Sequence, residues 1–79
     1  NILPNPNQGA FALKFYSTAG EVIELRVTNA IGEVVDTRTF EAHSGENHYY
    51  ISNRYFATGV YFVQLITEKG KGVKRMMVR

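Results

Sequence analysis

The chain has 79 residues, of which 44% are hydrophobic and 13% aromatic, and it contains no cysteine. This length indicates one domain with a small core, and the apolar content excludes a disordered chain. Without cysteine there is no disulfide framework, thiol nucleophile or cysteine-rich metal site. No apolar run approaches the ~20 residues that span a bilayer, so we expect no membrane insertion.

Positive charge is concentrated at the carboxyl end. Five of the nine Lys and Arg residues lie in the last eleven positions, with no acidic residue among them: Lys69, Lys71, Lys74, Arg75 and Arg79. Such a segment could bind nucleic acid or anionic lipid, prevent edge-to-edge strand pairing, or be recognised by another protein. No aromatic residue interleaves these charges, which argues against nucleic acid.

The dominant hydrophobic period is two residues, the period of half-buried strands. In chain order, the predicted strands cover residues 11–15, 23–27, 34–40, 49–51, 60–66 and 73–78. The run 34–40 alternates poorly, which is typical of an edge or bulged strand. The spacing predicts an all-β fold, an antiparallel β-sandwich of about six to seven short strands.

The first residues contain two prolines, Pro4 and Pro6, followed by Gly9. We interpret residues 1–8 as the end of a linker and the start of the domain, and residues 9–79 as the sandwich. Because proline fixes φ and removes a backbone donor, we expect these prolines to hold the junction extended and outside the sheet.

No catalytic, metal or cofactor site is predicted. His43 and His48 lie near Glu41 and Glu46, but a zinc site needs three or four ligands on a rigid frame, so a solvated loop is the favoured interpretation. Ser44 follows a histidine, yet nothing in the sequence indicates a triad or a nucleophile elbow.

Six aromatic residues fall within fourteen positions: Tyr49, Tyr50, Tyr55, Phe56, Tyr61 and Phe62. They could form a stacking platform for sugars or bases, but a small sandwich needs large inward residues, so most are assigned to the core. Tyr50 or Tyr55 is expected to be exposed. The hydroxyl of Tyr61 is expected to tie down the preceding loop, as a tyrosine corner does.

Five segments together resemble the C-terminal sorting domains of the type IX secretion system (type A). In order, they are "PNPNQGAF" (4–11), "VTNAIGEVV" (27–35), "SGENHYYI" (44–51), "FATGVYFVQL" (56–65) and "KGVKRMMVR" (71–79). Departures are Phe56 in the usual place of leucine, and Met76 and Met77 where isoleucine or valine is usual.

The resemblance implies an immunoglobulin-like β-sandwich that is a targeting module and not an enzyme. Such a domain ends a cargo protein, is recognised by the outer-membrane translocon, and is usually removed by a sortase-like cysteine peptidase that cuts near the preceding linker. It implies passage through the periplasm to the cell surface or medium of a Gram-negative bacterium. An edge strand would also permit self-association.

The resemblance also implies residue roles. The translocon would contact Lys71, Lys74, Arg75, Val78 and Arg79. Structural positions of the family motif would be Pro4, Asn5, Pro6, Gly9, Gly32, Gly45, Asn47, Gly59 and Tyr61. The alternative hypothesis is an immunoglobulin-like or fibronectin-like module that binds carbohydrate or protein through Tyr50, Tyr55 or nearby loops.

Overall fold

The computed structural model describes residues 2–79, and these residues form seven strands and no helix. The strands are β1 (Ile2–Leu3), β2 (Ala10–Ser17), β3 (Glu21–Asn29), β4 (Val34–Ala42), β5 (Gly45–Ser52), β6 (Gly59–Thr67) and β7 (Gly70–Val78). All six predicted strands are present, and most extend a few residues beyond the predicted ends. None of the residues that the structure describes forms a helix able to cross a membrane.

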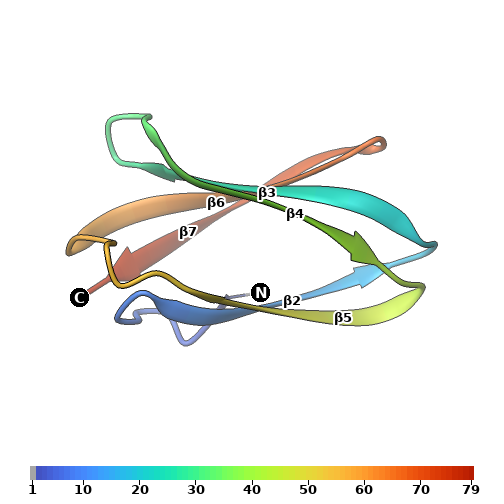
Figure 1. Ribbon diagram of the computed structural model, residues 1–79, viewed down its shortest axis with the longest axis horizontal. Helices are drawn as coiled ribbons and strands as arrows, with labels where there is room; N and C mark the ends of the chain where they lie inside the picture. The colour runs from blue at the N-terminus through green and yellow to red at the C-terminus, as the bar shows by residue number, and fades with distance from the viewer. Residues whose placement is uncertain (1) are drawn as a thin grey trace.

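The strands form two antiparallel sheets packed face to face (Figure 1). One sheet has the order β1-β2-β5 and the other has the order β4-β3-β6-β7. The predicted antiparallel β-sandwich is therefore confirmed. In a constant-type immunoglobulin domain the fourth strand joins the sheet of the first, second and fifth. Here β4 pairs with β3 instead.

Alternation along each strand explains which face is buried, because successive side chains point to opposite sides of a sheet. On β3, Ile23, Leu25 and Val27 face the partner sheet and are at most 2% exposed, whereas Glu24 and Arg26 face outward. Burying each such aliphatic side chain contributes about 1.5–3 kcal/mol. The core cluster comprises Ile2, Phe11, Leu13, Leu25, Val27, Ile51, Phe56, Tyr61, Val63, Met76 and Val78.

Strand β4 is one edge of the four-stranded sheet, and its pairing with β3 is irregular. Val27 pairs with Asp36, but the next residue, Thr28, pairs with Val34. This register shift confirms the predicted edge or bulged strand. The ring of Phe40 on β4 stacks on Tyr49 of β5 with a centroid distance of 4.1 Å, which joins the two sheets along this side.

The amino-terminal segment is part of the sandwich. Ile2 is 5% exposed and pairs with Leu13, and Leu3 pairs with Ala12. The expectation that the prolines hold this junction outside the sheet is therefore wrong, because the Ile2 side chain gains more by entering the core than by remaining in water. Residue 1 lies outside the described part of the chain. The division of the chain at residue 8 stays a prediction.

Candidate functional site

The candidate site is the flank of the sandwich where the amino-terminal segment meets β7. Strand β7 is an edge strand, so the backbone groups of alternate residues point away from β6. The side chain of Asn5 satisfies two of these groups. Its Nδ2 donates to the carbonyl of Arg75 (3.0 Å), and its Oδ1 accepts from the N–H of Met77 (3.0 Å). One amide side chain thus pairs with β7 as a short strand would.

Asn7 continues this pairing through its backbone. Its N–H donates to the carbonyl of Met77 (2.9 Å), and its carbonyl accepts from the N–H of Arg79 (2.8 Å). The Asn7 side chain is buried and donates to the carbonyl of Pro4 (3.1 Å), while its Oδ1 accepts from the N–H of Gly9 (2.8 Å). We call residues 4–9 the N-terminal arm, and the arm covers the final part of the β7 edge.

Gly9 is where the arm turns into β2. Its φ is +96°, and a Cβ at this position would stand 2.6 Å from the carbonyl oxygen of Asn53. The carbonyl of Gly9 also accepts from the N–H of Asn53 (2.9 Å). Only glycine satisfies both the positive φ and the close approach of the backbone. The prolines at positions 4 and 6 are exposed and have no N–H, so the asparagines make the contacts.

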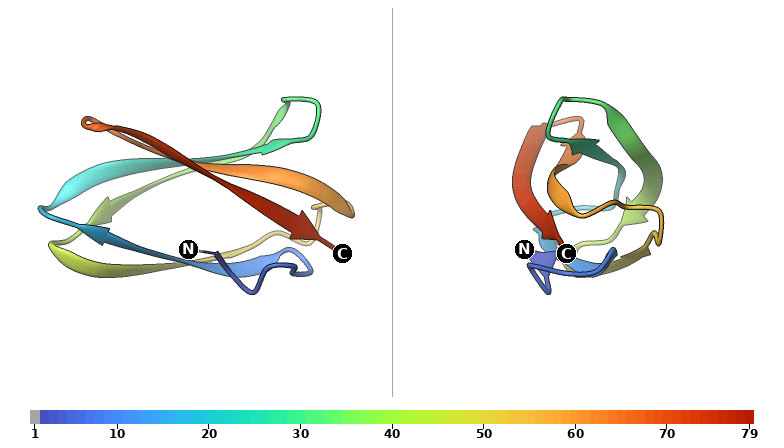
Figure 2. Two further views of the ribbon diagram at one scale, coloured as in Figure 1. Left: turned by 180° about the vertical axis from the view of Figure 1, so that it is seen from behind. Right: turned by 90° about the vertical axis from the view of Figure 1, so that its left-hand side faces the viewer.

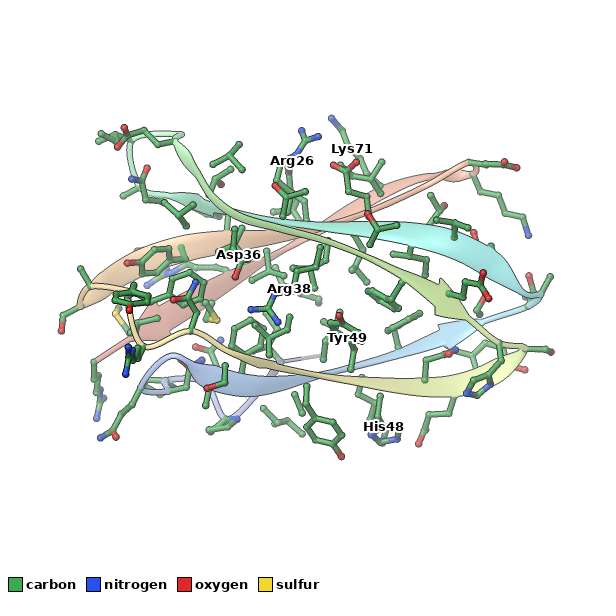
Figure 3. The ribbon with its side chains drawn as sticks, in the orientation of Figure 1. Arg26, Asp36, Arg38, His48, Tyr49 and Lys71 are labelled. Carbon is green, nitrogen blue, oxygen red and sulfur yellow. The ribbon has the colours of Figure 1, made fainter. Side chains whose placement is uncertain are left out.

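The remaining part of β7 is uncovered and cationic. Lys71, Lys74 and Arg75 are exposed, and Val73 is 50% exposed. Figure 3 shows Lys71 on the outer face of the four-stranded sheet, on the same side as Arg26. Among residues 2–79, the ion pairs are made by other cations and none involves a residue of β7.

Val78 and Arg79, also predicted as recognition residues, have different environments. Val78 is 2% exposed and belongs to the core cluster, so its side chain is not on the surface. This is a correction, and its cause is the two-residue alternation that turns Met76 and Val78 inward. Arg79 is exposed, but its N–H is bonded to Asn7. The exposed side chains of the predicted set are Lys71, Lys74, Arg75 and Arg79.

The predicted tyrosine contact is present. Tyr61 is 6% exposed, and its hydroxyl donates to the carbonyl of Ala57 (2.6 Å) in the loop before β6. The ring packs against Phe56 with a centroid distance of 5.1 Å. The hydroxyl therefore ties down the loop, as expected from its position two residues after Gly59.

The other predicted structural residues lie at connections between strands. Asn47 is buried; its Oδ1 accepts from the N–H of His43 (3.0 Å), and its Nδ2 donates to the carbonyls of His43 (2.8 Å) and Gly45 (3.1 Å). These bonds close the β4–β5 connection. Gly32, Gly45 and Gly59 have positive φ values of 89°, 105° and 156°.

His43 lies in the β4–β5 connection and His48 lies on β5, and both side chains are exposed. His48 Nε2 is 2.9 Å from Glu46 Oε1, and Lys14 Nζ is 3.5 Å from Glu46 Oε2. The hydrogen bond with His48 lowers the pKa of Glu46, and the charge of Lys14 adds to this effect. His43 Nδ1 instead contacts the carbonyl of Ser44 (3.0 Å). Within residues 2–79, no three acidic, histidine or cysteine side chains gather as metal ligands would.

The aromatic residues divide as predicted. Tyr50 and Tyr55 are 74% and 80% exposed. The ring contacts among residues 2–79 join Phe15 to Phe40, Phe40 to Tyr49, and Phe56 to Tyr61, and none joins the two exposed tyrosines. The exposed rings therefore do not form the shared stacking platform that sugar binding would favour.

Two sets of side chains with structural contacts were not predicted from the sequence. The side chain of Asn7 makes two hydrogen bonds within the arm. The spacing Asn-x-Gly, which is typical of an Asx turn, could have predicted this role. The Asp36 carboxylate accepts hydrogen bonds from Arg38 (3.2 Å) and from Asn53 (3.2 Å). The hydrogen bond between Arg38 and Asp36 raises the pKa of Arg38. Figure 3 shows Asp36 and Arg38 pointing between the sheets. Their charges interrupt the apolar alternation of β4, and this interruption could have pointed to the pair in the sequence.

Comparison with known proteins agrees with this architecture. A family model described as "Secretion system C-terminal sorting domain" matches residues 1–79. No curated protein matches the chain. Membership of this family implies a secreted or cell-surface protein in which a cargo occupies the same chain, and it implies interaction with the type IX secretion machinery. Domains of this kind are generally non-catalytic. The chain belongs to the C-terminal sorting domains of the type IX secretion system.

Proposed function

We propose that this domain directs an upstream cargo across the outer membrane through the type IX translocon and performs no reaction itself. Besides the family membership, one observation supports this proposal: the arm covers only the final part of the β7 edge. The arm covers the backbone from Arg75 to Arg79, whereas Lys71, Lys74 and Arg75 present unpaired positive charge beside it.

The uncovered cations suit recognition by an acidic surface of the translocon. Charged groups that make no ion pair within their own protein are available to a partner, and complementary charge accelerates encounter and fixes orientation. Val73 lies between Lys71 and Arg75 on the same face and supplies an apolar contact at the centre. We call these three residues, together with Lys74, which is exposed on the other side of this edge strand, the β7 patch.

The cargo leaves the domain next to this patch. The backbone and side chains of the N-terminal arm bond directly to β7, and Figure 2 shows the start of the described chain and the end of β7 on the same flank. We propose that the cargo passes through the periplasm in transit, and that a sortase-like cysteine peptidase cuts the linker once the cargo reaches the surface. The cargo is then released or held at the cell surface.

A fusion experiment tests the role of the β7 patch. A periplasmic reporter joined to this domain is expected to reach the surface of a cell that has the type IX machinery. The triple variant Lys71→Glu, Lys74→Glu and Arg75→Glu should remain in the periplasm. The matched control Lys14→Glu, Arg26→Glu and Arg54→Glu changes the net charge equally at positions outside the β7 patch, two of them exposed and Arg26 half-exposed, and should be exported.

Thermal unfolding of both triple variants separates recognition from folding. Deleting residues 71–79 would not do so, because that deletion removes Met76 and Val78 from the core. Equal export of the two triple variants, with unchanged melting temperatures, would show that the β7 patch is not recognised.

The alternative of a carbohydrate-binding module rests on a single feature. Tyr50 stands beside a shallow apolar groove that is lined by Leu3, Pro4, Ala10 and Ala12. If this groove served binding, Tyr50→Ala would abolish retention on a glycan column and leave export unchanged. Under the sorting function, we expect no glycan retention of the unmodified domain.

A further inference from the structure

On the flank where the N-terminal arm meets β7, the edge of β2 also has unpaired backbone groups. The N–H of Asn53 donates to the carbonyl of Gly9, so these two residues form a hydrogen-bonded pair of the β2–β5 ladder. The register is regular from there to Ser17, and hydrogen-bonded pairs alternate along an antiparallel ladder. The backbone groups of even-numbered β2 residues therefore point away from β5. Leu3 of β1 occupies the position opposite Ala12.

Further along β2, the structure provides no third strand. Strand β1 pairs only with Ala12 and Leu13, and within residues 2–79 no group bonds to the outward-facing N–H and carbonyl of Tyr16. Figure 1 shows the described chain beginning midway along β2, so that the last residues of β2 before β3 have no neighbouring strand on that side within residues 2–79. An unpaired edge of this kind is a site for strand addition.

A groove of about 380 Å³ opens between the sheets beside this unpaired edge. Its walls include Phe15 and Ser17 from β2, Ile23 from β3 and Leu65 from β6. The opposite rim is the β6–β7 hairpin, where Gly70 and Gly72 have no side chains to cover the opening. At the other end of the flank, Ile2 of β1 and Met76 and Val78 of β7 fill the corresponding space.

We infer that the linker that precedes Asn1 in the full chain extends β1 along β2 and covers this groove. A C-terminal sorting domain follows its cargo in the same polypeptide, so such a linker is present. Continuing the β1 register places the first, second and third residues before Asn1 opposite Phe15, Tyr16 and Ser17. The first and third share the inward side of Ile2 and face the groove, and the second exchanges backbone hydrogen bonds with Tyr16.

This inference rests on the family membership and is independent of how the translocon recognises the β7 patch. It predicts that the first residue before Asn1, which faces the groove opposite Phe15, is uncharged. It also places at least three linker residues inside the sheet. Residues paired in this way are not free to bind to a peptidase as an extended substrate. Limited proteolysis of the folded protein should therefore begin upstream of the third residue before Asn1.

Hydrogen exchange of the Tyr16 amide in the full-length protein is the direct test. We expect this amide to exchange about tenfold slower with the native linker than after replacing the second linker residue by proline, which removes its N–H and prevents regular pairing. The matched control places proline ten residues further upstream and should keep the protection. Equal exchange in the three proteins would overturn the inference.

A disulfide provides a second measurement that does not depend on exchange rates. Tyr16→Cys, at an exposed position, is combined with a cysteine at the second linker residue or at the first, which faces the opposite side of the strand. Mild oxidation should crosslink the former pair and not the latter. Crosslinking of both pairs to the same extent would indicate a mobile linker. Neither measurement involves export, so a failure here leaves the proposed sorting function untouched.

Discussion

The backbone N–H of Met77 donates a hydrogen bond of 3.0 Å to the side-chain Oδ1 of Asn5, 72 residues earlier in the chain. The same side chain donates to the carbonyl of Arg75, so a single asparagine satisfies two backbone groups at the edge of β7. Unpaired edges invite pairing with other chains. The arm therefore limits self-association through the final part of β7, while the β7 patch is left available.

Removing the arm's amides should destabilise the domain unequally. Asn7→Ala deletes two hydrogen bonds of a buried side chain and is expected to lower the free energy of unfolding by about 1–3 kcal/mol. Asn5→Ala acts at an exposed site and should cost about 0.5–1.5 kcal/mol. Urea unfolding measures both. The exposed neighbour Gln8→Ala is the control, and an Asn7→Ala protein as stable as this control would contradict the role of Asn7.

Gly9 and Gly72 should respond in opposite ways to alanine. At Gly9, the positive φ costs about 1–2 kcal/mol and the clash with the Asn53 carbonyl adds to it, so Gly9→Ala should be strongly destabilising. At Gly72 a Cβ meets nothing within 4 Å, and reduced freedom of the unfolded chain should make Gly72→Ala neutral or stabilising by about 0.5 kcal/mol. The two melting temperatures give the comparison, and similar values would refute it.

The hydroxyl and the ring of Tyr61 contribute separately. Tyr61→Phe loses the bond to Ala57 and is expected to cost about 1 kcal/mol, whereas Tyr61→Ala also loses the packed ring and should cost about 3–5 kcal/mol. Tyr50→Phe and Tyr50→Ala are matched controls at an exposed site and should change stability little. If Tyr61→Ala unfolded at the same denaturant concentration as Tyr50→Ala, the core assignment would fail.

Glu46 should make stability depend on acidity. Its pKa lies below the ordinary value of 4.5, chiefly because of the hydrogen bond with His48. A lowered pKa in the folded state stabilises the protein above the ordinary pKa, and this contribution disappears as the pH falls through the folded-state pKa. His48→Ala should raise the pKa of Glu46 and reduce the acid-dependent loss of stability. Carboxyl NMR titration measures the pKa, and His43→Ala, which should leave it unchanged, is the control.

Local pattern was sufficient to predict much of the fold. The alternation of Ile23, Leu25 and Val27 placed β3 and its buried face correctly, because side-chain direction in a strand follows from position alone. The spacing between Gly59 and Tyr61 predicted the tyrosine contact, since both partners lie within five residues. The poor alternation of residues 34–40 predicted an edge or bulged strand, and this pattern too lies within neighbouring residues.

What the pattern could not provide is which strand edges meet and which groups cover them. Val78 is a different case: it was assigned to the surface although the alternation of β7 was sufficient to place it inward. The contacts of Asn5 and Asn7 with β7, in contrast, join residues about seventy positions apart. Such pairings carry no local signal, because they exist only after the order β4-β3-β6-β7 has made β7 an edge. Periodicity in the chain decides which side chains are buried, and the packing of two sheets decides which backbone edges are covered and which face a partner.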